Sequence, residues 1–191
     1  MKLPIIELGL AAVIALALSG AALAQNVPEQ FVVSGKAAEK IQDFTTINLA
    51  TAERIADVCE KAAAAQGVQI SIMVLDKEGN HVYMDRMDGQ GYLNIITADM
   101  KARTALLLRE PSKNRMNRVI QDPTQELQQI QVGMFANSGG LPIVVDGEMI
   151  GAIGVGGGAG TGGDENCAIE GLKAVFGNRV LLPVYPQQKP N

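Results

Sequence analysis

The segment from Gly139 to Gly171 constrains the fold of this chain more than any other stretch. It consists of a short apolar strand, an Asp146-Gly147 turn, a second apolar strand, a glycine-rich run and the start of a helix. Asp-Gly between two apolar runs predicts a hairpin, because the tight turn needs a positive φ that glycine adopts without a Cβ clash. Asp164, after the glycine run, suits a helix N-cap. The segment therefore predicts a sheet that is at least partly antiparallel, with a backbone-exposing loop at a helix N-terminus where a ligand would be sought first.

The first 24 residues have the pattern of a secretory signal peptide. Lys2 is followed by an apolar run from Leu8 to Leu18 and by an Ala22-Leu23-Ala24 cleavage site. An uncleaved anchor is the alternative, but the run is short for a spanning helix of about 20 residues. Residues 25–45 form a polar lead-in, and no second segment is long and apolar enough to span a membrane. We therefore expect a periplasmic or secreted protein with no membrane span after signal cleavage.

The mature chain has 167 residues (191 minus 24), and its net charge stays at −4 because the signal contains one lysine, Lys2, and one acid, Glu7. A mildly acidic domain offers no electrostatic footprint for nucleic acid, so that class of partner is excluded. Its two cysteines, Cys59 and Cys167, each fall on the apolar stripe of a predicted helix. They are either two separate core residues or a disulfide between the first and last helices. The compartment of an exported protein permits disulfides.

Helical and strand periodicities alternate along the mature chain and predict one α+β domain over residues 46–178. Gly67 ends the first helix, and Pro111 cannot continue the second long one. Apolar groups on both faces of the first hairpin indicate a sheet covered on both sides, by helices or by another subunit. The expected order is a helix (46–66), a hairpin (68–75 and 81–87), three helices (93–109, 112–120 and 123–132), a hairpin (142–145 and 149–155), a helix (164–176) and an irregular Pro-rich tail (179–191).

His81 is the only histidine of the chain, which excludes HExxH sites, three-histidine zinc sites and clusters of histidine ligands. The run Gly154-Val155-Gly156 with Ala159 matches the G-x-G-x-x-A pattern of dinucleotide folds. The chain after the last helix is too short to supply the further parallel strand which that fold needs. Backbone N–H groups of this loop could still hold a carboxylate or a propionate. The alternative is a loop that needs glycine only to turn.

Two further elements carry polar side chains that are consistent with a pocket. On the middle helix, Lys101 and Thr104 lie on one face because they are three residues apart. Simple alternation along the strand 81–87 places Met84 and Arg86 on one side of the sheet and His81 on the other. Taken alone, these residues do not identify a ligand.

Four ordered motifs do more when they are considered together: VLDKEGNHVYMDRMDG (74–89), ADMKARTA (98–105), GGLPIVVDGEMIGAIGVGGG (139–158) and DENCAIEGL (164–172). This set resembles the GlcG/HbpS family, whose domain is called haem-degrading, and the resemblance runs from about residue 46 to residue 176. It implies a compact α+β domain with a five-stranded antiparallel sheet flanked by helices. It also implies homo-oligomers with haem or another tetrapyrrole bound near subunit contacts.

The resemblance makes haem the expected cofactor, with one departure from the family pattern. Many members carry a histidine just ahead of the A-x-x-K-A-x-T-A helix, where this chain has the sequence Gly-Tyr-Leu-Asn (91–94). The candidate iron ligand is therefore His81, with Met84, Met87 and Tyr92 as alternatives. The remaining cofactor-binding candidates are Arg86, Lys101, Thr104, Gly156, Gly157 and Gly158, among which Lys101 and the glycine backbone would hold a propionate.

Three functions fit this description. The leading hypothesis is an exported, oligomeric protein that binds haem or another tetrapyrrole. The alternative is a periplasmic enzyme of isomerase or lyase type that acts on a small organic acid or aldehyde in the same pocket, with Lys101, Asp164 and Glu165 as acid/base candidates. A third possibility is an accessory subunit of a catabolic oxidoreductase, which would dock through an apolar face of the sheet.

Overall fold

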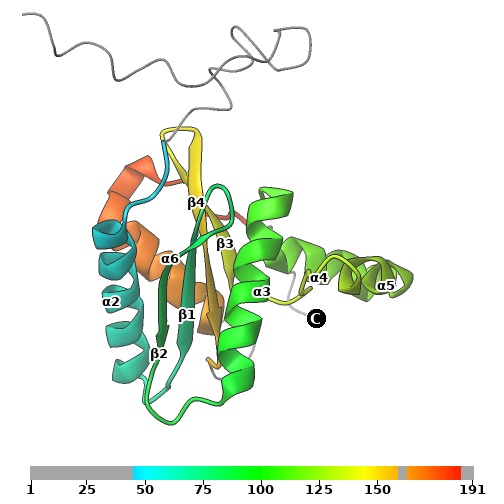
Figure 1. Cartoon of the computed structure of the whole chain (residues 1–191), viewed down its shortest axis with the longest axis horizontal. Helices are drawn as coiled ribbons and strands as arrows, with labels where there is room; N and C mark the ends of the chain where they lie inside the picture. The colour runs from blue at the N-terminus through cyan, green and yellow to red at the C-terminus, as the bar shows by residue number, and fades with distance from the viewer. Residues whose placement is uncertain (1–44, 159–162, 186–191) are drawn as a thin grey trace, which may run out of the picture. The chain divides into compact units, whose positions relative to one another are not determined.

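The protein is an α+β domain in which one four-stranded sheet is packed between helices (Figure 1). The computed structural model describes residues 45–158 and 163–185, so the predicted signal peptide (1–24) and nearly all of the lead-in lie outside it. None of the helices in these two ranges has the length and apolar character that crossing a membrane requires. The elements are α2 (Leu49–Ala65), β1 (Ser71–Asp76), β2 (His81–Arg86), α3 (Tyr92–Leu108), α4 (Ser112–Gln121), α5 (Thr124–Ile130), β3 (Gly140–Val145), β4 (Glu148–Gly156), α6 (Gly163–Phe176) and the 3-10 turn η2 (Gly177–Arg179).

Local sequence signals determine where these elements begin and end. The side chain of Asn48 caps α2 by accepting a 2.9 Å hydrogen bond from the N–H of Thr51. Gly67 follows the helix with a φ of +67°. The predicted Asp146-Gly147 turn joins β3 to β4, and both of its residues have positive φ, +52° and +87°. The hairpin expected from the sequence is therefore confirmed.

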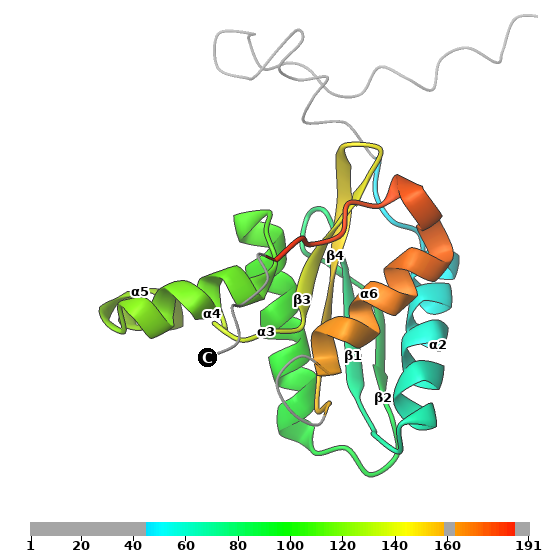
Figure 2. The ribbon, with the colours of Figure 1, turned by 180° about the vertical axis from the view of Figure 1, so that it is seen from behind.

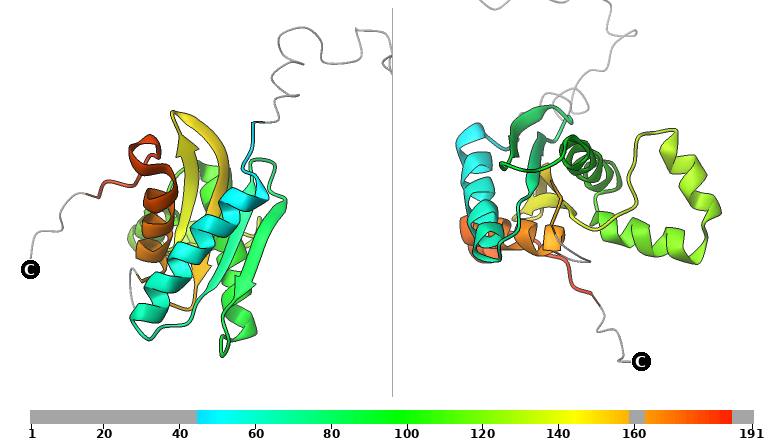
Figure 3. Two further views of the ribbon diagram at one scale, coloured as in Figure 1. Left: turned by 90° about the vertical axis from the view of Figure 1, so that its left-hand side faces the viewer. Right: turned by 90° about the horizontal axis from the view of Figure 1, so that it is seen from below.

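The strands follow the order β2-β1-β4-β3, and each neighbouring pair is antiparallel. Helices α2 and α6 cover one face of the sheet and α3 covers the other, as Figures 2 and 3 show from behind and from below. Side chains of β1 alternate between these layers. Ile72 and Val74 pack with α2 and α6, whereas Met73 and Leu75 pack with the alanines of α3. The prediction of a sheet covered on both faces is thus confirmed.

The described sheet has four strands, one fewer than the resemblance implied. Beside β3 the chain after η2 forms a single bridge, between Val145 and Val180, and no further strand among the described residues. The N–H of Leu181 donates to the carbonyl oxygen of Val144 at 2.8 Å. The next donor that would face β3 belongs to residue 183, which is a proline and has no N–H. The ladder therefore stops after one step.

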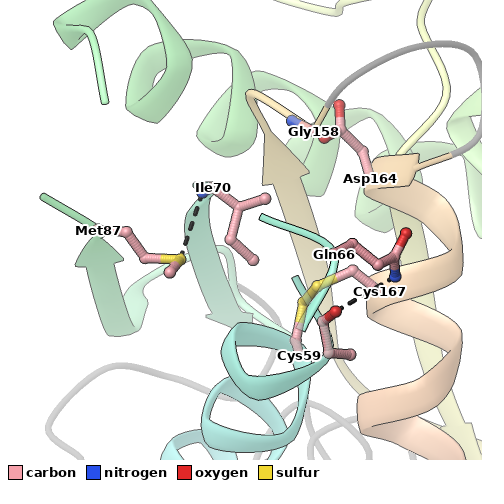
Figure 4. The surroundings of a disulfide bond; sticks show 8 residues. Cys59, Gln66, Ile70, Met87, Gly158, Asp164 and Cys167 are labelled. Atoms are coloured by element: carbon pink, nitrogen blue, oxygen red, sulfur yellow. Dashed lines mark hydrogen bonds between the residues drawn. A yellow bond between two sulfur atoms is a disulfide. The ribbon is translucent and has the colours of Figure 1, made fainter. Parts of the chain in front are cut away.

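A disulfide between Cys59 and Cys167 joins α2 to α6, with 4.7 Å between the two Cα atoms (Figure 4). Both cysteines are buried among the apolar side chains of the α2–α6 layer. This observation decides between the two interpretations that the sequence left open. The first and last helices of the domain are covalently linked across 108 residues of chain.

Three glycines allow α3 to lie directly on the sheet. A Cβ at Gly154 of β4 would meet the carbonyl oxygen of Ala98 and would lie 2.6 Å from the nitrogen of Ala102. Gly140 and Gly156 face the α3 backbone in the same manner. Part of the glycine run is therefore explained by close packing between a helix and a sheet rather than by a ligand.

A β-bulge in the first hairpin changes which side chains share a face. Val74 pairs with Tyr83, but Leu75 pairs with His81, so that Val82 is an extra residue in β2. His81 consequently lies on the α3 side of the sheet, as Met84 and Arg86 do. The alternation expected from the sequence, with His81 on the opposite side, is wrong at this position because a bulge shifts the two-residue period.

Candidate functional site

The predicted site residues divide into a buried polar cluster and an open strip along β2. The buried cluster is centred on Lys101 of α3, which is 3% exposed. Its ammonium nitrogen lies 2.6 Å from Oδ2 of Asp164 and donates to the carbonyl oxygen of Val155 at 2.9 Å. The other carboxylate oxygen of Asp164 accepts the N–H of Gly158 at 2.6 Å. Lys101 and Asp164 thus bind each other and tie together α3, the end of β4 and the start of α6.

Glu165, the next residue of α6, is 2% exposed and is bound by other parts of the chain. The hydroxyl of Ser138 donates to one carboxylate oxygen at 2.5 Å, and the hydroxyl of Tyr185 donates to the other. Burial, together with the hydrogen bond to this carboxylate, raises the pKa of Tyr185 well above its ordinary value. The three acid/base candidates, Lys101, Asp164 and Glu165, therefore lie together, and each has partners within the protein.

The remaining candidates of this region lie at its edges. Thr104 donates to the carbonyl oxygen of Met100 at 2.8 Å and accepts the N–H of Phe135 at 2.8 Å. Gly156 packs against the α3 backbone, and Gly157 lies against the side chain of Gln90 with a φ of +93°. The N–H of Gly158 binds the Asp164 carboxylate of the chain itself, and not the haem propionate that was expected there.

His81, at the start of β2, is half exposed and contacts two charged residues of α3. Its Nε2 lies 3.0 Å from Oδ1 of Asp99 and 2.9 Å from a guanidinium nitrogen of Arg103. The same Nε2 either accepts from Arg103 through its lone pair or carries a hydrogen and donates to Asp99. Arg103 also binds Asp99 directly at 2.9 Å. The imidazole therefore has two alternative hydrogen-bonding states, and only one of them leaves the nitrogen without a proton.

Met84 and Arg86 extend the same side of β2 beyond His81. Met84 is 60% exposed, and the Arg86 guanidinium donates to the carbonyl oxygen of Gln90. Tyr92, at the first turn of α3, is 77% exposed. We call His81, Met84 and Arg86 the β2 strip. It brings an imidazole, a thioether and a guanidinium together on one open face.

Met87 lies apart from the strip. Its sulfur accepts the N–H of Ile70 at 3.4 Å, as Figure 4 shows, and the residue packs against the α2–α6 layer. Among the predicted iron-ligand alternatives, Met84 shares the face of His81, and Met87 does not.

Asp99 and Arg103 are site residues that sequence reasoning missed. Their spacing of four residues on a predicted helix was an available signal, because such pairs meet on one helix face. Their contact with His81 was not readable, since it depends on the bulge that turns His81 toward α3.

A second missed feature lies on the other face of the sheet, where Glu60 of α2 meets Asp85 of β2. Burial and the neighbouring Asp85 carboxylate raise the pKa of Glu60 to about 7. The hydroxyl of Tyr83 donates to Asp85 at 3.3 Å, and burial with the same carboxylate raises its pKa to about 12. Glu60 and Asp85 line an open cavity of about 450 Å³. No group of three or more His, Cys, Asp and Glu side chains in residues 45–158 and 163–185 is arranged to hold a metal ion.

Comparison with known proteins extends over most of the described domain. The family model described as "Haem degrading protein HbpS-like" matches residues 47–173. An uncharacterized 15.0 kDa protein from the dhaT–dhaS intergenic region of Citrobacter freundii is 33% identical over 123 residues, 62% of this chain and 85% of that protein. Protein GlcG of Escherichia coli K12 is 32% identical over 96 residues, 50% of this chain and 70% of GlcG. The crystal structure of a double mutant of Streptomyces reticuli HbpS is 31% identical, covers 77% of this chain and 97% of that one, and superposes with a TM-score of 0.65. The chain belongs to the HbpS-like haem-degrading protein family.

Proposed function

We propose that this protein is exported and binds haem, with the β2 strip as its iron-binding face. The observation that carries the proposal is that the half-exposed imidazole of His81 and the exposed thioether of Met84 lie on one side of the edge strand β2. The chain also belongs to a family described as haem-degrading. Imidazole and thioether are both ligands of haem iron in proteins. The donor set of the strip therefore fits the group.

His81 is the proposed iron ligand. Ligation requires an unprotonated ring nitrogen, so iron would compete with Arg103 for Nε2 and would require the ring to leave Asp99. Arg103 contacts His81, and Arg86 lies on the same face at the other end of β2. We propose these two cations as the propionate contacts. Lys101 and Gly158 are less suited to that role, because Asp164 already binds both.

The test is a spectroscopic titration of the mature protein with hemin. We expect a saturable Soret shift in the wild type, loss of that shift in His81→Ala, and an unchanged titration in Glu148→Ala, which removes an exposed charge at the first residue of β4, outside the β2 strip. A shift no larger than that given by a protein that does not bind haem would refute haem binding. An unchanged spectrum in His81→Ala would refute His81 as the ligand, and Met84→Ala would then identify whether the thioether replaces it.

We propose export on the basis of the N-terminal signal pattern and the disulfide. A disulfide between buried cysteines forms and persists in oxidising compartments and is rare in the cytosol. The expected result is a periplasmic chain that begins at Gln25 and has a mass 2 Da below that of its reduced form (about 1 Da for each thiol hydrogen lost). A cytosolic chain of full length with two free thiols would contradict the proposal.

We also propose that the protein forms homo-oligomers. Four large apolar side chains of α3 are exposed, and a second copy would bury them: Tyr92, Leu93, Ile96 and Leu107. Because Leu93 is 67% exposed, Leu93→Glu should leave the monomer folded while weakening association. Sedimentation velocity of the two forms measures this. A wild type that stays monomeric at high concentration would exclude the assembly.

A further inference from the structure

A cavity of about 340 Å³ lies on the opposite edge of the domain from the β2 strip. One wall is the edge of β3, where partly exposed Val144 and the buried residues Leu141 and Pro142 line the cavity. A second wall is the tail segment 181–185, and the third is the corner between α3 and α4, which includes Arg109. Its volume lies in the range of small-molecule sites, about 300–1,000 Å³.

The tail wall is fixed in place by several contacts. Leu181 is hydrogen-bonded to β3, and Arg179, just before it, forms an ion pair with Asp146 in the β3–β4 turn. At the other end of the segment, the hydroxyl of Tyr185 donates to buried Glu165, and the ammonium of Lys113 lies 4.1 Å from the centre of the Tyr185 ring. The match to the family model ends at residue 173, so this wall lies outside the matched range.

The two charged side chains that line the cavity differ in whether they have a partner of opposite charge. The carboxylate of Glu110 accepts hydrogen bonds from Arg118 and Asn114, and the bond from Arg118 lowers its pKa. Its negative charge is thus neutralised within the protein. Arg109 is the cation of the lining, and it has no hydrogen-bond or ion-pair partner among the residues that the structure describes. Arg109 is the C-cap of α3 and comes directly before Glu110 and Pro111. It is one of two non-glycine residues in the described chain with a positive φ, which is +55°.

We propose that this cavity binds a small amphipathic monocarboxylate. The apolar body of such a ligand would lie between Val144 of β3 and Leu181 of the tail, and its carboxylate would bind the guanidinium of Arg109. Charge complementarity selects an anion, because the carboxylate of the lining already has a cation, whereas the guanidinium has no anion among the described residues. Among the described lining residues Arg109 is the one cation, and this favours one carboxylate over a di- or triacid. This site is separate from the β2 strip and does not depend on haem binding.

The test is calorimetric titration of the mature protein with octanoate and with octanamide, its neutral counterpart of nearly the same shape. We expect octanoate to bind with at least tenfold higher affinity than octanamide. Arg109→Gln should remove this difference and leave the octanamide affinity unchanged, and Arg109→Lys should restore part of it. Arg54→Gln, which removes an exposed positive charge of α2, is the matched control and should bind as the wild type does.

A second variant tests the place of binding. Leu181→Trp enlarges a tail side chain that is 68% exposed and lines the cavity, so it should obstruct the site without unfolding the domain. We expect it to weaken both ligands at an unchanged thermal midpoint. Equal affinity for octanoate and octanamide, full octanoate binding by Arg109→Gln, or no saturable binding would each overturn the proposal. Displacement of bound hemin by octanoate would also overturn it, because the cavity would then belong to the haem site.

Discussion

Removal of the Cys59–Cys167 disulfide should destabilise the domain by several kcal/mol. The bond closes a loop of 108 residues, for which the chain-entropy relation gives a loss of about 16 cal/mol/K in the unfolded state. This entropy corresponds to about 4.8 kcal/mol at 25 °C, and native disulfides typically contribute about 2–4 kcal/mol. Alanine at both positions leaves apolar side chains in an apolar layer, so we expect a net loss of about 3–5 kcal/mol for Cys59→Ala/Cys167→Ala. That is a large part of the roughly 5–15 kcal/mol by which a typical domain is stable.

Urea unfolding, followed by far-UV circular dichroism, measures this loss. Three samples separate its causes: the oxidised wild type, the wild type reduced with dithiothreitol, and the double alanine variant. We expect the reduced protein and the variant to unfold at similar, lower urea concentrations. Their dependence on urea should be steeper, because an unfolded chain without the cross-link exposes more surface. Equal midpoints for oxidised and fully reduced wild type, with reduction verified by mass, would refute the reasoning.

Three further substitutions probe groups that the fold places in contact. The pKa of Glu60 is about 7 in the folded protein, against an ordinary value of 4.5. The folded state therefore binds the proton of this carboxyl group more tightly than the unfolded state does, and the stability of the domain falls as pH rises from about 4.5 to 7. A shift of that size is worth about 3 kcal/mol by linkage, and solvent screening of this half-buried group reduces it to roughly 1–2 kcal/mol. Glu60→Gln should therefore unfold at higher urea than the wild type at pH 8 and not at pH 4.5, and a difference independent of pH would contradict this cause. Gly154→Ala drives a Cβ into the α3 backbone and should cost about 3 kcal/mol. Gly91→Ala has open space around its Cβ and replaces only the N-cap residue of α3, so it should cost no more than about 1 kcal/mol in thermal unfolding. Lys101→Met leaves the buried Asp164 carboxylate without its cation and should lower the free energy of unfolding by about 3–5 kcal/mol. Adding Asp164→Asn should recover part of that free energy. Purely additive losses for the two substitutions in urea unfolding would argue against a coupled pair.

The elements of the fold could be predicted because their signals are local. The Asp146-Gly147 turn, the Asn48 cap and the glycine after α2 each act through their own backbone angles. Helical periodicity and Pro111 similarly placed the long helix α3 and its end. The resemblance carried by the four motifs implied an α+β domain with helices around an antiparallel sheet, which the structure and its similarity to HbpS confirm.

The candidate site was only partly predictable, because its contacts join positions far apart in the chain. Lys101 was selected as an anion contact, but its partner Asp164 lies 63 residues away and reaches it only when α6 packs beside β4. His81 was selected as the candidate iron ligand, and the structure shows its imidazole half exposed. Its neighbours Asp99 and Arg103 were not selected, because a single inserted residue in β2 decides which face His81 occupies.

The sequence alone therefore determined the turns, the helix ends, the order of elements and the family, all of which depend on nearest neighbours or on motifs read along the chain. Only the tertiary structure decided that the two cysteines pair, that the glycines of β4 serve close packing with α3, and that the tail after the last helix closes a cavity against β3. These features depend on the distance between elements in space. The distance between two elements is set only when the helices on both faces have packed against the sheet.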